Sequence, residues 1–503
     1  MKQRKKIANL SKSKFVAGLQ CLKRLYLLCY EDQLVGEPDE ATQARFDQGA
    51  EVGELARKAF EGGALVDKPY WEVQGVVEQT QRLVADKSVP AIFEGAFEHD
   101  NVIVRPDVLR REPGGKWDLI EVKSGTEVKE VHIPDVAIQK HVLRSCGLKL
   151  RRCFLMHLDR SYVYDGGEYD LQRLFHLAEV SREVANFEQE LKGCLAAQQK
   201  TLRLTRAPSV EPGPQCTDPY ECEFHDLCNQ QLPENHISTL YRLRQERLEE
   251  LEAMGVETLD QIPDGFPLSK TQERMVDCVK SGKPYVDPLV KEQLAALEYP
   301  LYFMDFETCN PALPRFPGMR PYDPFPFQWS VHVQKSPGAK PQHYEFLSTD
   351  GSDPREPFTA ELLSVLSKHG KDGNIVVYSR PFEDSRLREL TEWLPQHGSA
   401  IEEVRGRLWD LLSLVRKHVY HPGFQGSFSI KNVLPALVPE MTYDGMDVAD
   451  GTEAGLAYES IVRGELTAME KQWLQKSLRE YCRLDTLAMV EILDRLRRTG
   501  RSQ

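Results

Sequence analysis

The chain has no long hydrophobic run. None of its apolar stretches approaches the roughly 20 residues that a helix needs to cross a bilayer. Its basic start, Met1 to Lys6, is not followed by the apolar segment of a signal peptide. Repeats of solenoid length and low-complexity tracts are missing too. We therefore expect a cytoplasmic protein with no membrane partner.

A surplus of positive charge is also missing. The 77 acidic residues outnumber the 64 Lys and Arg residues, and the net charge is −13. This balance argues against electrostatic attraction to nucleic acid along the whole chain. The first 30 residues nevertheless contain eight Lys or Arg and no Asp or Glu. Either a phosphate-binding surface or a solvated face fits this segment and the basic positions Lys149, Arg151, Arg152, Arg203 and Arg206.

The length and composition predict a multidomain globular protein. With 503 residues, of which 41% are hydrophobic and 28% charged, the chain is too long for one ordinary core. We expect a first domain at 1–232, a helical spacer at 233–299 and a third part at 300–503. The turn at Gly255 makes the spacer either a helix-hairpin-helix that binds phosphate or a plain helical connection. Strands followed by helices predict an α/β domain with a mixed sheet in the third part.

Two β-rich runs in the first domain carry acidic and basic residues. The runs 102–109 and 117–123, joined by a turn with two glycines, predict an antiparallel hairpin. Alternation places Glu121 and Lys123 on one face of the second strand, and Asp107 on the first strand can reach that face. Two carboxylates can hold a divalent ion, and an ammonium group can orient water or stabilise phosphate charge. The set predicts a metal-dependent nuclease.

Eleven cysteines in a cytoplasmic chain indicate metal or redox use for some of them and not a disulfide framework. Cys216, Cys222 and Cys228 are separated by five residues each in a polar segment that contains prolines, and Cys21 is the candidate fourth ligand. Four thiolates suit an iron–sulfur cluster or a zinc ion, and His225 keeps a site with three cysteines and one histidine open. The other seven cysteines, Cys482 among them, are expected to be core residues.

The hairpin and the four cysteines together resemble the RecB-like PD-(D/E)XK nucleases that contain an iron–sulfur cluster. The resemblance implies a restriction-endonuclease-like α/β core for the first domain. It implies that Asp107 and Glu121 bind Mg²⁺ or Mn²⁺ and that Lys123 is the catalytic lysine. It also implies a 4Fe-4S cluster held by Cys21, Cys216, Cys222 and Cys228.

The motifs of this family are incomplete in the chain. Gln139, on a predicted helix after the hairpin, matches the glutamine motif, but Leu143 stands where the family has a tyrosine. A histidine commonly follows a glycine at a spacing of four residues in the family, whereas here Gly49 is followed by Gly53. Glu94 is therefore the candidate for a further metal ligand.

A second set of acidic residues lies in the third part of the chain. Asp305 and Glu307 are two residues apart on an apolar strand, so both project to the same face. Tyr481 and Asp485 are four residues apart on a predicted helix and share one of its faces. Such carboxylates can hold two divalent ions for phosphodiester hydrolysis, while a tyrosine hydroxyl orients the attacking water.

This order of residues resembles the DEDDy branch of the DnaQ-like 3′–5′ exonucleases. The resemblance implies an RNase H-like α/β domain with a mixed sheet over residues 300–503. In its middle motif, Ser379 replaces an asparagine and Glu383 takes the position of an aspartate, with Asp384 beside it. Asp410 is either a further acidic residue of the site or the charge at a helix N-terminus.

The whole chain resembles bacterial RecB-family proteins fused to a domain of unknown function. We therefore expect an α/β multidomain nuclease with two metal-dependent sites that acts in DNA repair, processing or defence. Its partner is nucleic acid, with DNA favoured over RNA because the first family mostly cuts DNA. Two alternatives stay open: an RNA exonuclease, and a nucleic-acid-binding or complex-assembly protein in which one or both nuclease sites are degenerate.

Overall fold

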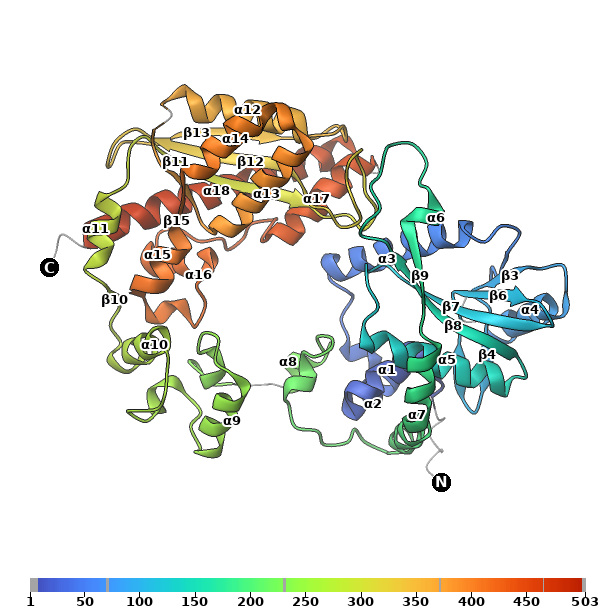
Figure 1. Ribbon diagram of the computed structural model, residues 1–503. Coiled ribbons are helices and arrows are strands. Elements are labelled where there is room, and N and C mark those ends of the chain that lie inside the picture. Colours follow the sequence, from blue (N-terminus) through green and yellow to red (C-terminus); the bar gives the residue numbers. More distant parts are fainter. Residues whose placement is uncertain (1–7, 69–71, 229–231, 371, 465, 500–503) are drawn as a thin grey trace. The chain divides into compact units, whose positions relative to one another are not determined.

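The computed structural model describes residues 8–68, 72–228, 232–370, 372–464 and 466–499 (Figure 1). The chain divides into two compact units, Met1–Gln230 with Pro311–Asp323, and Gln231–Asn310 with Pro324–Gln503. Both units combine helices with sheets, which confirms the prediction of a mixed α/β multidomain protein. The expected spacer at 233–299 falls within the second unit. Within the ranges just given, no helix is long and apolar enough to cross a membrane.

The first unit contains a six-stranded sheet with the order β2-β3-β6-β7-β8-β9. β6 is antiparallel to both β3 and β7, and β8 is parallel to β7. A second sheet has the order β1-β5-β4. The strands are β1 (Leu10–Ser11), β2 (Ala64–Leu65), β3 (Ala91–Phe93), β4 (Phe97–His99), β5 (Val102–Val104), β6 (Val108–Glu112), β7 (Lys116–Lys123), β8 (Lys149–Leu158) and β9 (Phe175–Glu179).

Hydrophobic cores lie on both faces of the six-stranded sheet. Leu119 and Leu155 belong to a core with α5 and α7, whereas their neighbours Ile120 and Phe154 belong to a core with α3. This division follows from the alternation of side chains along a strand, and burial of both faces explains the apolar run in β7. The helices are α1 (Lys12–Gln20), α2 (Leu22–Tyr30), α3 (Glu40–Lys58), α4 (Val73–Ala85), α5 (Ile133–Ser145), α6 (Leu171–Leu174), α7 (Ser181–Leu202) and α8 (His225–Cys228).

The predicted strand over 102–109 is wrong as a single element. It consists of β5 and β6, which belong to different sheets. Pro106 lies between them and has no N–H to donate to a ladder, so the chain turns there. The hairpin of β6 and β7 forms as predicted, with Val108 opposite Ile120. Asp107 therefore lies in the bend before β6 and not within a strand.

The second unit contains a five-stranded sheet with the order β13-β12-β11-β14-β15. β12 is antiparallel to β11 and β13, whereas β14 is parallel to both β11 and β15. All ten residues of β12 are buried, as expected for a strand between two others. The strands are β10 (Tyr285–Val286), β11 (Leu301–Cys309), β12 (Phe325–Gln334), β13 (Gln342–Leu347), β14 (Ile375–Val377), β15 (Leu408–Asp410) and β16 (Val419–Tyr420).

The two faces of β11 have different neighbours. Tyr302, Met304 and Phe306 belong to a core with α12, α13 and α14. The alternate residues Asp305 and Glu307 project to the opposite face, and α17 and α18 pack against β11. The helices are α9 (Gln245–Ala253), α10 (Lys270–Ser281), α11 (Leu289–Ala295), α12 (Arg355–Lys368), α13 (Arg380–Trp393), α14 (Gly398–Gly406), α15 (Leu411–His418), α16 (Ile430–Leu437), α17 (Gly451–Arg463) and α18 (Ala468–Thr499).

Candidate metal and cluster sites

The first candidate centre lies around β7. Lys123 Nζ is 2.9 Å from Glu121 Oε1 on the same strand. Asp107 Oδ2 accepts a hydrogen bond of 2.6 Å from the backbone N–H of Val122. Gln139 on α5 donates to Glu121 Oε2 over 2.8 Å. The structure thus brings together the carboxylates, the lysine and the glutamine that the sequence singled out.

Lys12 also belongs to this centre, and sequence reasoning missed it. Its Nζ lies 2.7 Å from Glu121 Oε1 and 3.8 Å from Asp107 Oδ1. The pairing of β1 with β5 and the N-cap hydroxyl of Ser11 fix the start of α1, and Lys12 is its first residue. Since Lys12 precedes Glu121 by 109 residues, no local pattern signals this contact.

Asp135 is the other missed residue of the centre. Its Oδ2 lies 2.6 Å from Lys123 Nζ. It precedes Gln139 by four residues on α5, so the shared helix face was a signal that could have found it. Asp135 Oδ1 and Gln139 Oε1 are buried oxygens without a hydrogen-bond partner among the described residues. Such orphaned acceptors fit a site that binds a cation or ordered water.

The charges of the centre shift its pKa values in different directions. Burial acts to raise the pKa of Glu121, but attraction by Lys12 and Lys123 outweighs burial and holds this pKa well below its ordinary value. Burial, followed by repulsion from Glu121, raises the pKa of Asp107 to about 7. Burial acts to lower the pKa of Lys123, but Glu121 and Asp135 raise it above its usual range. Near neutral pH, Glu121 is therefore ionised between two ammonium groups.

Glu94 lines a cavity beside Asp107. The cavity has a volume of about 250 Å³, and Gly49, Gly53 and Arg57 of α3 also line it. A Cβ atom built on either glycine would meet no atom within 4 Å. Open space therefore lies where the resemblance leads us to expect a histidine. Burial raises the pKa of Glu94, although Arg57 lies 4.0 Å away.

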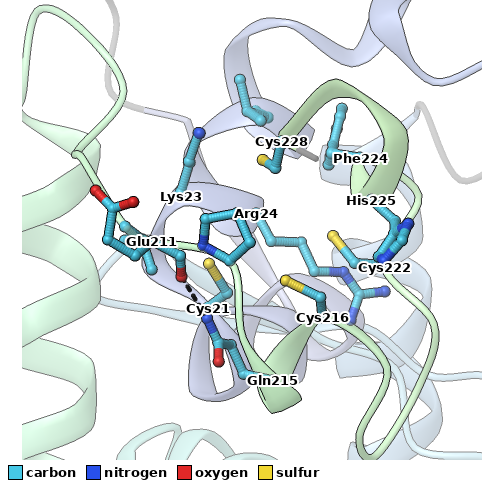
Figure 2. Close-up of a pocket in the computed structure, with 13 residues that line it drawn as sticks. Cys21, Lys23, Arg24, Glu211, Gln215, Cys216, Cys222, Phe224, His225 and Cys228 are labelled. Carbon is cyan, nitrogen blue, oxygen red and sulfur yellow. Dashed lines mark hydrogen bonds between the residues drawn. The ribbon is translucent and has the colours of Figure 1, made fainter. Parts of the chain in front are cut away.

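The four cysteines that the sequence singled out line one pocket. Cys21 directly precedes α2. Cys216 ends a 3-10 turn, Cys228 ends α8, and Cys222 lies in the loop that joins this turn to α8. Figure 2 shows their side chains around a common space. His225 lines the same pocket and is a further candidate ligand.

Hydrogen bonds hold the two cysteine-bearing segments together. Gln20 donates to the carbonyl oxygens of Gln215 and Tyr220 over 2.7 and 2.6 Å. Arg24 donates through two nitrogens to the carboxylate of Glu223 over 2.8 and 2.7 Å. These contacts join residues nearly 200 positions apart. The protein chain itself thus positions the four thiols, and a bound metal would tie the same segments together.

The second candidate centre lies between β11 and α18. Asp305, Glu307 and Cys482 each offer a ligand atom, and these three atoms lie within 4.8 Å of one another. Cys482 Sγ is 3.8 Å from Asp305 Oδ2. Asp485, less than one turn further along α18, accepts a hydrogen bond of 2.6 Å from the Tyr443 hydroxyl. Tyr481 precedes Asp485 by four residues on α18, so the two lie on the same face of this helix.

The middle motif contributes Glu383 but not its acidic neighbour. Glu383 is buried in the first turn of α13, and its Oε2 lacks a hydrogen-bond partner among the described residues. Its carboxylate repels those of Asp305 and Glu307 on β11. Asp384 instead forms an ion pair with Arg405 at 2.9 Å. Asp410 accepts a hydrogen bond of 2.6 Å from the Ser413 N–H and caps α15. The helix α15 therefore begins directly after this residue, and 408–410 form β15.

The carboxyl groups of the second centre all have raised pKa values. Burial is the largest cause at Asp305 and Glu307, and repulsion from Asp485 is the next, so both pKa values lie well above the ordinary range. Burial raises the pKa of Asp485 to about 6, despite the hydrogen bond from Tyr443. Burial and repulsion raise the pKa of Glu383 to about 8. Buried carboxylates with this pattern are stabilised by a proton or a metal cation.

Sequence reasoning missed three residues of the second centre. Cys482 is buried, as predicted, but its thiol lies against a carboxylate and not in a purely apolar core. Tyr443 lies 42 residues from its partner Asp485, so no local spacing relates the two. Burial raises the pKa of both Glu307 and Asp485, and electrostatic attraction by Lys431 opposes this rise at each of them.

Comparisons with known proteins found a family match within the second unit and one distant relative. Residues 302–429 match a family described as a domain of unknown function, DUF2779. This segment includes Asp305, Glu307 and Glu383 but ends before α18. The chain is also similar to the uncharacterized protein UU173 of Ureaplasma parvum serovar 3, with 23% identity over 263 residues, 45% of this chain and 36% of that protein. Neither match assigns a reaction to the chain.

Proposed function

We propose that the protein is a metal-dependent nuclease that hydrolyses phosphodiester bonds at two centres, one in each unit. The observation that carries the proposal is the same in both units. Acidic residues from separate parts of the sequence converge on one strand of a mixed sheet: Asp107 lies beside β7, and Asp485 repels the carboxylates of Asp305 and Glu307 on β11. Oxygen ligands of this kind suit Mg²⁺ and Mn²⁺, and the orphaned buried oxygens at both centres fit a cation.

The arrangement of strands supports a RecB-like core in the first unit. Two antiparallel pairs, β3/β6 and β6/β7, are followed by α5 and the parallel strand β8. A bound divalent ion would polarise the phosphate and lower the pKa of a bound water. Asp107 and Glu121 would hold it, while Gln139 fixes the orientation of the Glu121 carboxylate. Lys123 keeps its proton and can stabilise charge that develops on the phosphate oxygens.

The strand order of the second sheet supports the DnaQ-like, RNase H-fold interpretation of the second unit. Numbered along the chain, the order is 3-2-1-4-5, with the second strand antiparallel to its neighbours. Asp305, Glu307 and Asp485 would hold the divalent ions, with Glu383 on the adjacent helix α13. The Tyr481 hydroxyl stays protonated because burial and nearby carboxylates raise its pKa, so it can donate a hydrogen bond to an attacking water.

We further propose that Cys21, Cys216, Cys222 and Cys228 bind a 4Fe-4S cluster. Their four thiols line one pocket, and four thiolates are the usual ligand set for this cluster. The cluster would fasten α2 to the segment around α8 and restrict the unfolded chain. Protein purified without oxygen should be brown and contain iron and sulfide. A colourless protein with stoichiometric zinc would replace the cluster with a zinc site.

DNA is the favoured substrate, and two variants test the whole proposal. End-labelled single- and double-stranded DNA and RNA are incubated anaerobically with Mg²⁺ or Mn²⁺. Lys123→Ala should remove one chelator-sensitive activity and Asp305→Ala a separate one, each by about 100-fold or more. Lys87→Ala, at an exposed position after α4, serves as the control with unchanged digestion. Equal digestion by wild type and both variants would disprove the two-site assignment.

A nucleic-acid-binding protein with degenerate sites is the second candidate. The open space at Gly53 and the position of Glu383 favour it, because both depart from the ligands that the families use. Binding measured separately from cleavage distinguishes the two candidates. Tight binding without product across a wide range of Mn²⁺ concentrations would favour the binding protein.

A further inference from the structure

We propose that Lys12 is an internal counter-cation of the first centre, and that a divalent ion must displace its ammonium group in order to bind. This inference rests on the proposed metal site at Asp107 and Glu121. The Lys12 ammonium would compete with the metal for the same carboxylates. Lys12 belongs to α1, a helix that the sequence motifs of the site do not include.

The contacts of the two carboxylates carry the inference. Asp107 Oδ2 accepts the Val122 N–H, and Glu121 Oε2 accepts the amide of Gln139. The other oxygen of each carboxylate, Asp107 Oδ1 and Glu121 Oε1, faces Lys12 Nζ at 3.8 and 2.7 Å. These two oxygens are the ones available to a cation that bridges both carboxylates. The Lys12 ammonium therefore occupies the place that a bridging metal would take.

The second lysine of the centre has a different role. Lys123 Nζ shares Glu121 Oε1 but has Asp135 as its other partner, at 2.6 Å. When a metal takes up Glu121 Oε1, Lys123 keeps a carboxylate partner of its own. Lys12 has both of its ion-pair partners among the expected metal ligands. Lys12 is thus the ammonium that loses its partners when the metal binds.

Lys12 is also able to leave without disturbing the fold. Its side chain is 25% exposed, and its four-carbon stem can swing toward solvent. The backbone stays in place, since Ser11 caps α1 and β1 pairs with β5. In the absence of metal the ammonium screens the repulsion between the carboxylates. In its presence the same group weakens metal affinity, because an ion pair must be broken.

Direct metal binding tests the inference. Mn²⁺ titrations followed by electron paramagnetic resonance use the full chain with Asp305→Asn, so that the first centre is observed alone. Lys12→Met removes the charge and keeps an unbranched side chain that is one atom shorter, and it should bind Mn²⁺ about tenfold more tightly, equivalent to about 1.4 kcal/mol. Lys12→Arg and the control Lys14→Met should retain the weaker affinity. Folded Lys12→Met protein with equal or weaker affinity would overturn the inference.

A measurement on the wild-type protein covers the case in which Lys12→Met does not fold. Acylation by an amine-selective reagent, read by mass spectrometry, should increase several-fold at Lys12 when Mn²⁺ saturates the centre, relative to exposed Lys87. Unchanged labelling of Lys12 would refute the displacement. Cleavage is assayed separately. Tighter Mn²⁺ binding by Lys12→Met without any cleavage would reject the nuclease function and retain the inference. Cleavage by a Lys12→Met protein whose Mn²⁺ affinity equals that of the wild type would retain the nuclease function and reject the inference.

Discussion

The two carboxylate centres balance their charge by different means. Around β7, the ammonium groups of Lys12 and Lys123 lie 2.7 and 2.9 Å from Glu121 Oε1. Around β11, the described hydrogen-bond partners of the carboxylates include the thiol of Cys482 and the hydroxyl of Tyr443. The ammonium groups outweigh burial and lower the pKa of Glu121, whereas burial and mutual repulsion raise the pKa values on β11.

This difference shows that the same ligand chemistry can be assembled in two ways. The first centre is held together by its own cations, so its geometry is prepared before a metal binds and the metal must compete. The second centre keeps buried carboxylates close together, and a proton or a metal must supply the missing charge. We therefore expect removal of a carboxylate charge to destabilise the first unit and to stabilise the metal-free second unit.

The largest expected effect is at Glu121. In chelator-treated protein, Glu121→Gln should lower the stability of the first unit by about 3 kcal/mol, because it leaves two largely buried ammonium groups without their shared partner. Hydrogen exchange of peptides that cover β7 measures the change. Glu98→Gln, an exposed residue of β4, is the matched control. Exchange rates in β7 that equal those of the wild type would remove the proposed contrast between the centres.

A smaller effect of opposite sign is expected at Asp305. At about pH 8 and without metal, Asp305→Asn should stabilise the second unit by about 1–2 kcal/mol, since one pKa unit corresponds to 1.36 kcal/mol and the variant removes a repelling charge. It should also abolish stabilisation by Mn²⁺. Asp384→Asn is the control, because that carboxylate pairs with Arg405. Destabilisation by Asp305→Asn would show that the carboxylates are compensated in some other way.

The pH dependence of the second unit should follow the same logic. The pKa values of Asp485, about 6, and Glu383, about 8, lie above their ordinary values of 3.8 and 4.5. The folded state therefore binds these protons more tightly than the unfolded state. The resulting stability is present below the ordinary values and is lost as the pH rises through the folded values.

Calorimetry with and without chelator measures this dependence. Metal-free protein should show a falling transition temperature for the second unit between about pH 5 and pH 8, by about 2–4 °C for each kcal/mol lost. Mn²⁺ or Glu383→Gln should flatten the dependence. A metal-free transition that rises over this range would contradict the assigned pKa directions.

Local sequence patterns predicted the parts of both centres that lie within single elements. The two-residue alternation placed Asp305 and Glu307 on one face, and helical spacing grouped Tyr481 with Asp485. The structure agrees with these patterns because strand and helix geometry are set by neighbours in the sequence. The bend at Pro106 was not predicted, although proline interrupts a ladder and was a signal that could have indicated it.

Contacts between distant elements were out of reach of these patterns. Lys12 reaches Glu121 through the pairing of two short strands, and Tyr443 reaches Asp485 across 42 residues. Neither contact produces a periodic pattern in the sequence, because each depends on how whole elements pack. The four cysteines were an exception: thiols in a polar loop need partners, and the composition of that loop indicated a shared site.

The smallest predicted effect sharpens the comparison through metal preference. Cys482 Sγ lies within 4.8 Å of the ligand atoms of Asp305 and Glu307, so the second centre offers one soft ligand beside two hard ones. Thiolates prefer Cd²⁺ and Zn²⁺ to Mg²⁺ and Mn²⁺, whereas the carboxylates, amide and ammonium groups around Glu121 offer no sulfur. Cys482→Ser should therefore weaken Cd²⁺ binding at the second centre about fivefold, or about 1 kcal/mol, and change Mn²⁺ binding little. Displacement of Mn²⁺ by Cd²⁺ in a Glu121→Gln background measures this, and an unchanged preference would mean that the thiol stays protonated and the centre is built from oxygen ligands alone.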